Sequence, residues 1–337
     1  MVNVAVATLP AVAFLAALLL MDSFKLVTWR TVLVALLVGG AAALGSSAVN
    51  ARLVEGLELD HLVLSRYVAP LVEEGLKAVF VLWLVRRGRI GFLVDAAILG
   101  FAVGTGFALV ENLEYLRSVP ERRLLLWIVR GFGTAMLHGG ATALFAVLTK
   151  TLFDRHHGRA RALAAFVPGL LLAVALHSLF NHFLLPAVAS TLLLLVVLPV
   201  LMVAVFGHSE RATRAWLGVG LDTDLELLGS ILSGSVLRTR VGAYLESLKA
   251  HLPGPVVADM LCLLRIQLEL GIRAKGLLLA REAGFDMPVA DDTRASLQEL
   301  RYLEGAIGPT GLLAMKPILR RSSRDLWEVY LLERGLG

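Results

Sequence analysis

The feature that most constrains the fold is an apolar run at residues 62–85 that carries charges near its middle. The run is long enough to cross a lipid bilayer, which takes about 20 apolar residues. Glu73, Glu74 and Lys77 lie inside it, and each charge at that depth costs at least about 2.5–3.5 kcal/mol on insertion scales. Because such charges are rare and usually functional, the run predicts a membrane-spanning helix that holds part of a site.

The spacing of these charges predicts a pairing. In a helix Glu73 and Lys77 are four residues apart, and Glu74 and Lys77 are three apart, so Lys77 can neutralise one carboxylate. The other carboxylate then stays free to handle protons. Pro70 lacks an amide proton and is expected to loosen the helix one turn earlier. The alternative is a buried ion pair that only fixes helix packing, and the three charges alone leave it open.

Six further apolar segments accompany this run, and together they predict an all-α polytopic membrane protein with about seven transmembrane helices. The seven segments are residues 2–21, 31–49, 62–85, 96–116, 124–149 (or a start just after Arg130), 164–185 and 187–206. Only 18% of the chain is charged, against about 25% in soluble domains. Residues 1–21 have no basic n-region and no small-residue cleavage site, so we expect a first span rather than a signal peptide.

Loop charges predict the orientation in the membrane. The loops at 22–30, 86–95 and 150–163 carry nine Lys and Arg, whereas the N-terminus, the loops at 50–61 and 117–123 and the turn near Pro186 carry four. The positive-inside rule then places the N-terminus outside and the C-terminal region in the cytoplasm, for which a bacterial cytoplasmic membrane is the expected setting. The net charge of +5 belongs to these loops, so no nucleic-acid partner is expected.

A second domain is predicted after Gly207, where the composition becomes charged. Residues 208–337 show helical spacing at 225–232, 241–252 and 256–280, with breakers at 253–255, Gly284, Pro288 and 308–309. We therefore expect residues 1–207 to be a transmembrane domain and 208–337 a soluble, cytosolic α-helical domain of unknown role. Recruitment of a cytosolic partner or of the substrate is our hypothesis for it.

Polar residues in three other apolar segments complete a candidate site. They are Glu111 in the fourth segment, His138 in the fifth, and His177 with Asn181 in the sixth. With a rise of 1.5 Å per residue, Glu111, His177 and Glu73 lie about 8, 12 and 16 Å below the outer membrane edge. Carboxylates and imidazoles at overlapping depth are what water activation requires.

The same residues leave the use of a metal open. Glu111, His138 and His177 would make an open three-ligand Zn²⁺ site with Glu73 or Glu74 as general base. A mechanism with glutamate and histidine alone needs no cofactor. The single cysteine, Cys262, excludes an internal disulfide and a cysteine-rich metal site.

In this order the motifs resemble the PrsW family of intramembrane proteases, within the superfamily of CAAX prenyl proteases and bacteriocin-processing enzymes. The motifs are Glu73-Glu74-x-x-Lys77, Phe107-x-x-x-Glu111-Asn112, His138 and His177-x-x-x-Asn181. The superfamily motifs are EExxxR, FxxxH and HxxxN/B, so Lys77 and Glu111 depart from them, and the PrsW branch shares both departures. The resemblance covers about residues 60–185.

The resemblance implies that the transmembrane domain hydrolyses a peptide bond of a membrane-anchored protein, an anti-sigma factor in the PrsW branch. It implies that Glu73 and Glu74 activate the water, while Lys77 and Asn112 tune the charge of the carboxylates. It further implies that Glu111, His138 and His177 bind the water, a metal or the oxyanion, and that Asn181 orients His177 or donates to the oxyanion.

The residues alone leave two other functions open. One is a non-hydrolytic proton-coupled transporter or membrane sensor with titrating Glu and His residues, although no internal repeat relates the first three segments to the next three. The other is an endopeptidase of prenylated protein tails, which would need an opening on the cytoplasmic side.

Overall fold

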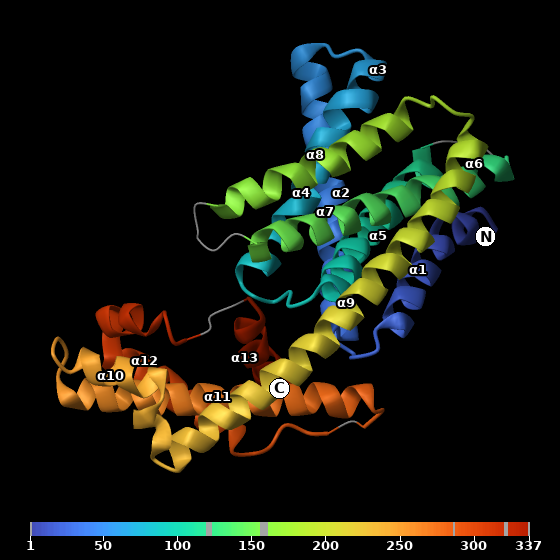
Figure 1. The fold of residues 1–337 in the computed structure, drawn as a ribbon. Helices are drawn as coiled ribbons and strands as arrows, with labels where there is room; N and C mark the ends of the chain where they lie inside the picture. The colour runs from blue at the N-terminus through green and yellow to red at the C-terminus, as the bar shows by residue number, and fades with distance from the viewer. Residues whose placement is uncertain (1, 119–122, 156–160, 286, 320–322, 336–337) are drawn as a thin grey trace. The chain divides into compact units, whose positions relative to one another are not determined.

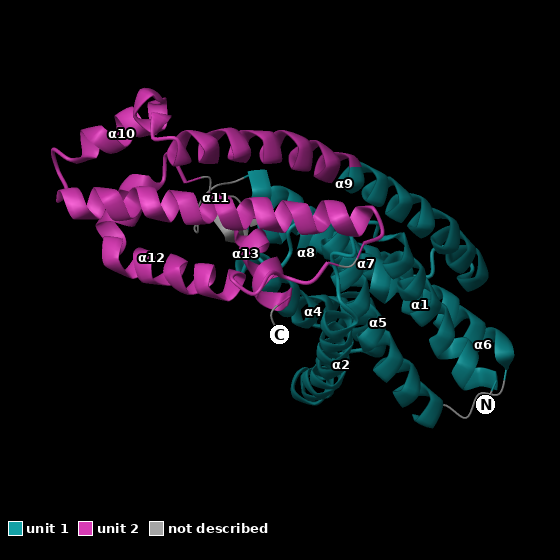
Figure 2. Cartoon of the chain, turned by 90° about the horizontal axis from the view of Figure 1, so that it is seen from below, with its two compact units in different colours: residues 1–210 teal, residues 211–337 magenta. Residues whose placement is uncertain are grey.

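The computed structural model describes residues 2–118, 123–155, 161–285, 287–319 and 323–335. All regular structure among these residues is helical, and none of them lies in a strand. They divide into two compact units, residues 1–210 and residues 211–337 (Figure 2). The predicted all-α fold is confirmed.

Unit 1, residues 1–210, is a succession of helices that follow the apolar segments (Figure 1). They are α1 (Val2–Met21), α2 (Trp29–Leu57), α3 (His61–Val63), the π-helix η1 (Leu64–Val68), α4 (Ala69–Arg86), α5 (Leu93–Ser118), α6 (Leu124–Ile128), the π-helix η2 (Val129–Thr134), α7 (Ala135–Arg155), α8 (Arg161–Asn181) and the first part of α9 (Ala187–Leu232). The apolar segments at 62–85 and 124–149 are therefore each interrupted by a short π-helix, or π-turn: η1 in the first and η2 in the second.

Six helical stretches among the described residues are long and apolar enough to cross a membrane. They are Val2–Met21, Trp29–Leu57, Leu93–Ser118, Leu124–Arg155, Ala164–Asn181 and Ala187–Leu232. Helix α4 is not among them because its 18 residues include Glu73, Glu74, Lys77 and Arg86. The chain is thus a polytopic membrane protein, while the count of seven spans and the orientation stay predictions. Residues 119–122 and 156–160, which enter the loop-charge count, lie outside the described residues.

Helix α5 lies at the centre of unit 1 and packs against α1, α2, α4 and α7. Every residue from Val94 to Ala108 is buried. A Cβ atom at Gly104 would lie 2.1 Å from the carbonyl oxygen of His138 on α7, so these two backbones touch directly. Small residues permit such close packing of membrane helices. The glycine therefore brings the start of α7, and His138 with it, against the middle of α5.

Unit 2, residues 211–337, begins within α9, which continues without a break from Ala187 past Gly207 to Leu232. The helices that follow are η3 (Ser235–Arg238, a 3-10 helix), α10 (Arg240–Leu248), α11 (Gly254–Glu282), α12 (Thr293–Met315) and α13 (Ser323–Gly335). Helix α11 packs against α10, α12 and α13. The change of composition at Gly207 thus falls inside a continuous helix and does not mark its end.

The breakers of unit 2 act where the sequence predicts them. Helix α11 begins at Gly254 with a proline in its first turn, and Gly284 adopts a φ of 83° just after its end. Gly308, with a φ of 70°, kinks α12. These are positive-φ conformations that glycine adopts without steric cost.

Candidate active site

Helix α4 buries the three charged side chains near its start, Glu73, Glu74 and Lys77, to different degrees. The side chains of Glu74 and Lys77 are 2% and 0% exposed, and Lys77 Nζ lies 2.5 Å from Glu74 Oε1. Glu73 is 12% exposed, and its Oε2 atom is buried without a hydrogen-bond partner. Glu74 is therefore neutralised by Lys77, as the spacing predicts, and Glu73 is the carboxylate of α4 that keeps an unengaged oxygen.

The π-turn η1 places α4 against α8. Ala69 donates its amide proton to the carbonyl oxygen of Leu64, five residues back, and Pro70 has no amide proton to donate. The carbonyl oxygens of Ser65 and Arg66 are instead bonded by α8, with Asn181 Nδ2 at 2.8 Å and Ser178 Oγ at 2.6 Å respectively. The loosening expected before Pro70 is thus a π-turn, and side chains of α8 satisfy the carbonyl groups that it leaves.

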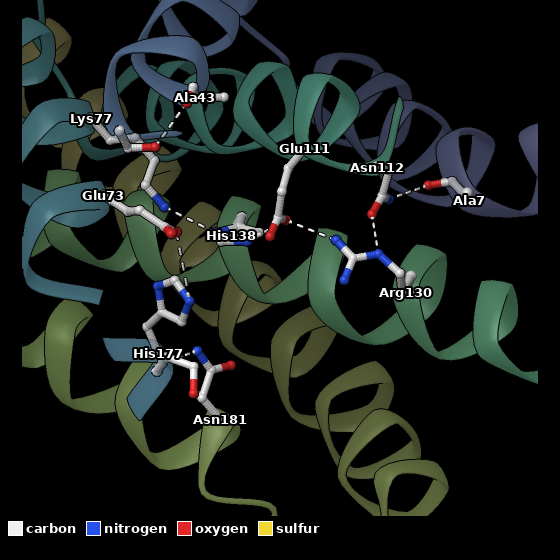
Figure 3. A network of polar contacts seen from close by, with 12 residues as sticks. Ala7, Ala43, Glu73, Lys77, Glu111, Asn112, Arg130, His138, His177 and Asn181 are labelled. Carbon is white, nitrogen blue, oxygen red and sulfur yellow. Dashed lines mark hydrogen bonds and ion pairs between the residues drawn. The ribbon is translucent and has the colours of Figure 1, made fainter. Parts of the chain in front are cut away.

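His138 on α7 lies between two charged neighbours. Its Nε2 atom is 3.1 Å from Glu111 Oε2, and its Nδ1 atom is 3.0 Å from Lys77 Nζ. A carboxylate only accepts and an ammonium group only donates, so the ring carries its proton on Nε2 and accepts at Nδ1. Figure 3 shows Glu73 and Glu111 on opposite sides of the ring. His138 therefore turns Nε2 toward α5 and Nδ1 toward α4.

His177 on α8 faces both carboxylates of α4. Its Nδ1 atom is 2.9 Å from Glu74 Oε1, and its Nε2 atom is 3.8 Å from the unpartnered Glu73 Oε2. Because Glu74 accepts the Nδ1 proton, the lone pair at Nε2 points toward Glu73. The ring stands edge-on to His138, with 4.8 Å between the ring centroids. Glu74 thus fixes the orientation of His177.

Glu111 on α5 connects this cluster to Arg130 of η2, as Figure 3 shows. Arg130 Nη2 lies 3.1 Å from Glu111 Oε2, and Arg130 Nε donates to Asn112 Oδ1 at 2.8 Å. The Asn112 amide nitrogen in turn donates to the carbonyl oxygen of Ala7 on α1 at 2.7 Å. Arg130 is the residue that the sequence reasoning missed. The one signal for it was a single arginine inside the apolar segment at 124–149.

The donor atoms that converge closely enough for a metal ion come from Glu73, His138 and His177. All three donors lie within 4.8 Å of one another. This set differs from the expected Glu111, His138 and His177, because Glu111 lies beyond His138 and is paired with Arg130. Two imidazoles and one carboxylate make up a donor set typical of an open catalytic Zn²⁺ site.

The residues predicted for the site therefore fall into three groups. Six of them form one chain of polar contacts across α4, α5, α7 and α8: Glu73, Glu74, Lys77, Glu111, His138 and His177. Asn112 reaches the chain through Arg130. Asn181 hydrogen-bonds the backbone of η1 rather than His177, and so supports the site from outside.

Comparison with known proteins identifies the family. The model of a family described as PrsW family intramembrane metalloprotease matches residues 24–207, which extends beyond the 60–185 covered by the motifs. No curated protein and no solved structure matches the chain. The matched residues include the whole cluster from Glu73 to His177 and exceed half of the 337 residues. The chain therefore belongs to the PrsW family and is an intramembrane protease.

Proposed function

We propose that the protein hydrolyses a peptide bond of a membrane-anchored protein at the cluster formed by Glu73, His138 and His177. The observation that carries this proposal is the convergence of their donor atoms within 4.8 Å around the unpartnered Glu73 Oε2. Buried polar atoms are normally hydrogen-bonded, so an orphaned carboxylate oxygen between helices favours a ligand or a reactant there. A purely structural ion pair would not leave that atom unengaged.

The same residues fit a Zn²⁺ ion in kind and number, and Glu73, His138 and His177 would hold it. Glu73 Oε2 and His177 Nε2 both have free lone pairs directed at each other across 3.8 Å. His138 would have to exchange its hydrogen bond with Lys77 for the ion. A bound Zn²⁺ would supply Lewis acidity to polarise the scissile carbonyl and activate a water.

The remaining residues of the cluster orient the two histidines and balance the charge around Glu73, His138 and His177. Glu74 accepts the Nδ1 proton of His177, and Glu111 accepts the Nε2 proton of His138. Each imidazole thereby presents its other nitrogen to the site, as carboxylate partners of metal-binding histidines do. Lys77 neutralises Glu74, so that its carboxylate can stay buried beside His177.

In the metal-free form of this proposal, proton transfer belongs to Glu73, because an Oε2 atom that held Zn²⁺ would not be available as the base. Within the described part of the site its Oε2 is the carboxylate oxygen that is buried without a hydrogen-bond partner. It can accept a proton from the attacking water and return it to the amine of the leaving peptide. Glu74 is already engaged by Lys77 and His177, which makes it unsuited to that role.

The test is cleavage of a membrane-anchored reporter by the purified protein in detergent or lipid vesicles. We expect Glu73→Gln and His177→Ala each to lower kcat by at least about 100-fold, as loss of a catalytic group does. His182→Ala is the matched control, because His182 lies on the same stretch of chain but bonds Tyr67 and the Ser178 backbone. Cleavage by Glu73→Gln and His177→Ala at the wild-type rate would contradict the proposal. A wild-type protein that does not cleave the reporter would favour a transporter or sensor.

A further inference from the structure

Arg130 is held in place more firmly than a lone arginine at a helix start requires. Its side chain is only 10% exposed, and its Cζ atom lies 3.6 Å from the centroid of the Tyr115 ring. The Asn112 side chain accepts from Nε and is itself anchored on the Ala7 carbonyl of α1. Stacking and one bonded edge fix the plane of a guanidinium group, so its Nη end has a defined direction.

The backbone of η2 is fixed as well. A Cβ atom at Gly131 would lie 1.9 Å from the carbonyl oxygen of Val6 on α1, and one at Gly133 would lie 2.5 Å from Thr191 Oγ1 on α9. Arg130 therefore lies in a backbone segment that packs directly against α1 and α9. The Ala135 amide proton bonds the Arg130 carbonyl five residues back, the hydrogen bond that defines a π-turn.

The Nη2 atom of Arg130 lies next to the carboxylate of Glu111. It lies 3.1 Å from Glu111 Oε2, which is itself 3.1 Å from His138 Nε2. Nη2 is buried, and its contact with Glu111 is an ion pair without the geometry of a hydrogen bond, so the interaction between them is one of charge. Glu111 is 22% exposed, and without a cation its side chain is free to turn away from the imidazole.

We propose that Arg130 is a positioning residue for peptide hydrolysis, which holds Glu111 against His138 Nε2 and so keeps Nδ1 of that ring turned into the site. This inference rests on the proposed function, because it assigns Arg130 a role in that same reaction. The competing role is a structural one, in which Arg130 only ties α1 to α5 through Asn112. The two roles predict different behaviour of variants.

Kinetics of Arg130→Gln and Arg130→Lys separate the two roles. We expect Arg130→Gln to lower kcat by about 10- to 100-fold with KM nearly unchanged. Losses of this size are usual when a group that supports a histidine of the site from outside is removed. Arg130→Lys should recover part of the loss, because an ammonium group still faces Glu111. Arg117→Gln, which removes an exposed arginine from the end of α5, should cleave at the wild-type rate.

A double-mutant cycle with Glu111→Gln tests whether Arg130 acts through Glu111. Adding Arg130→Gln to Glu111→Gln should cost no further activity, and the two substitutions should also be non-additive in the thermal midpoint. Independent losses in both measurements, or a loss in Arg130→Gln confined to stability, would overturn the inference. A wild type that cleaves nothing would contradict the proposed function instead, and the thermal cycle would still decide whether Arg130 holds Glu111.

Discussion

Lys77 is the side chain on which the charge balance of the site depends. It is fully buried, donates to Glu74 Oε1 and to His138 Nδ1, and lies 4.4 Å from the centroid of the Phe107 ring. Glu74 is equally buried, so its carboxylate has no access to water as a substitute partner. Removing one member of a buried pair is costly because it leaves the other charge uncompensated.

Lys77→Met should therefore destabilise the protein by about 3–5 kcal/mol. Adding Glu74→Gln should recover most of that loss, because the double variant no longer buries an unpaired charge. Thermal or denaturant unfolding in detergent measures both effects. The matched control is Lys249→Met, which breaks an i,i+3 pair with Glu246 of nearly the same length, 2.6 Å, on the surface. That variant should change stability by less than about 1 kcal/mol. Equal losses for Lys77→Met and Lys249→Met would contradict this account.

Most of the side chains in the candidate site could be predicted from the sequence, and so could the pairing of Lys77 with a carboxylate of its own helix, but the partners of the two histidines could not. Charges and imidazoles stand out in apolar segments, which identified Glu73, His138 and the others. Which carboxylate joins the histidines depends on how far each helix is rotated, and helix ends are uncertain by several residues. Glu111 was expected among the donors but lies on the opposite side of the His138 ring from Glu73. Arg130 went unrecognised because an arginine at a segment boundary suggests the end of a span.

At the scale of elements, a π-turn precedes each of two site helices. η1 ends where α4 begins, and η2 ends where α7 begins. Glu73 and His138 each lie within about two turns of helix after the π-turn that precedes them. Short π-helical segments are frequent at functional sites. Pro70 made the first one predictable. Nothing comparable marks the second, whose close packing on α1 and α9 appears only in the folded chain.

Contact between α5 and α7 sets the position of His138, and Gly104 is the residue that permits it. Gly104→Ala would place a Cβ atom 2.1 Å from the His138 carbonyl oxygen. The two helices would have to separate, which should cost about 1–3 kcal/mol and remove most cleavage activity. Thermal unfolding and reporter cleavage check both effects.

Gly75→Ala on α4 is the control for that substitution. It lies next to Glu74, yet its added Cβ atom would meet nothing within 4 Å. Alanine should raise helix stability there by roughly 0.5–1 kcal/mol. A Gly104→Ala protein as stable and active as Gly75→Ala would show that the close approach of α5 and α7 is not needed.

For the whole molecule, all described contacts of the site lie within unit 1. Composition predicted the all-α membrane fold and the helical character of unit 2, because both depend on local apolar spacing. The sequence did not indicate that α9 continues past Gly207, because a change from apolar to charged residues was interpreted as a boundary, although charged residues can continue a helix. Unit 2 has its own buried pairs, in which Lys275 lies 2.8 Å from Asp224 and 2.6 Å from Glu328.

Recruitment of a partner or substrate by residues 208–337 stays a hypothesis. A protein truncated after residue 232 that cleaves as well as the full chain would refute it.

The measurement that tests the central claim most directly is elemental analysis of the purified full-length protein, alongside the double variant His138→Ala/His177→Ala and the control His182→Ala. We predict about one zinc per chain, as an open three-ligand site binds, in the wild type and in the control. We predict none in the double variant, which should also fail to cleave the reporter. A zinc-free wild type that still cleaves would contradict the metal centre and leave Glu73 as the base of a metal-free hydrolase. Zinc retained by the double variant would contradict the assignment of its ligands.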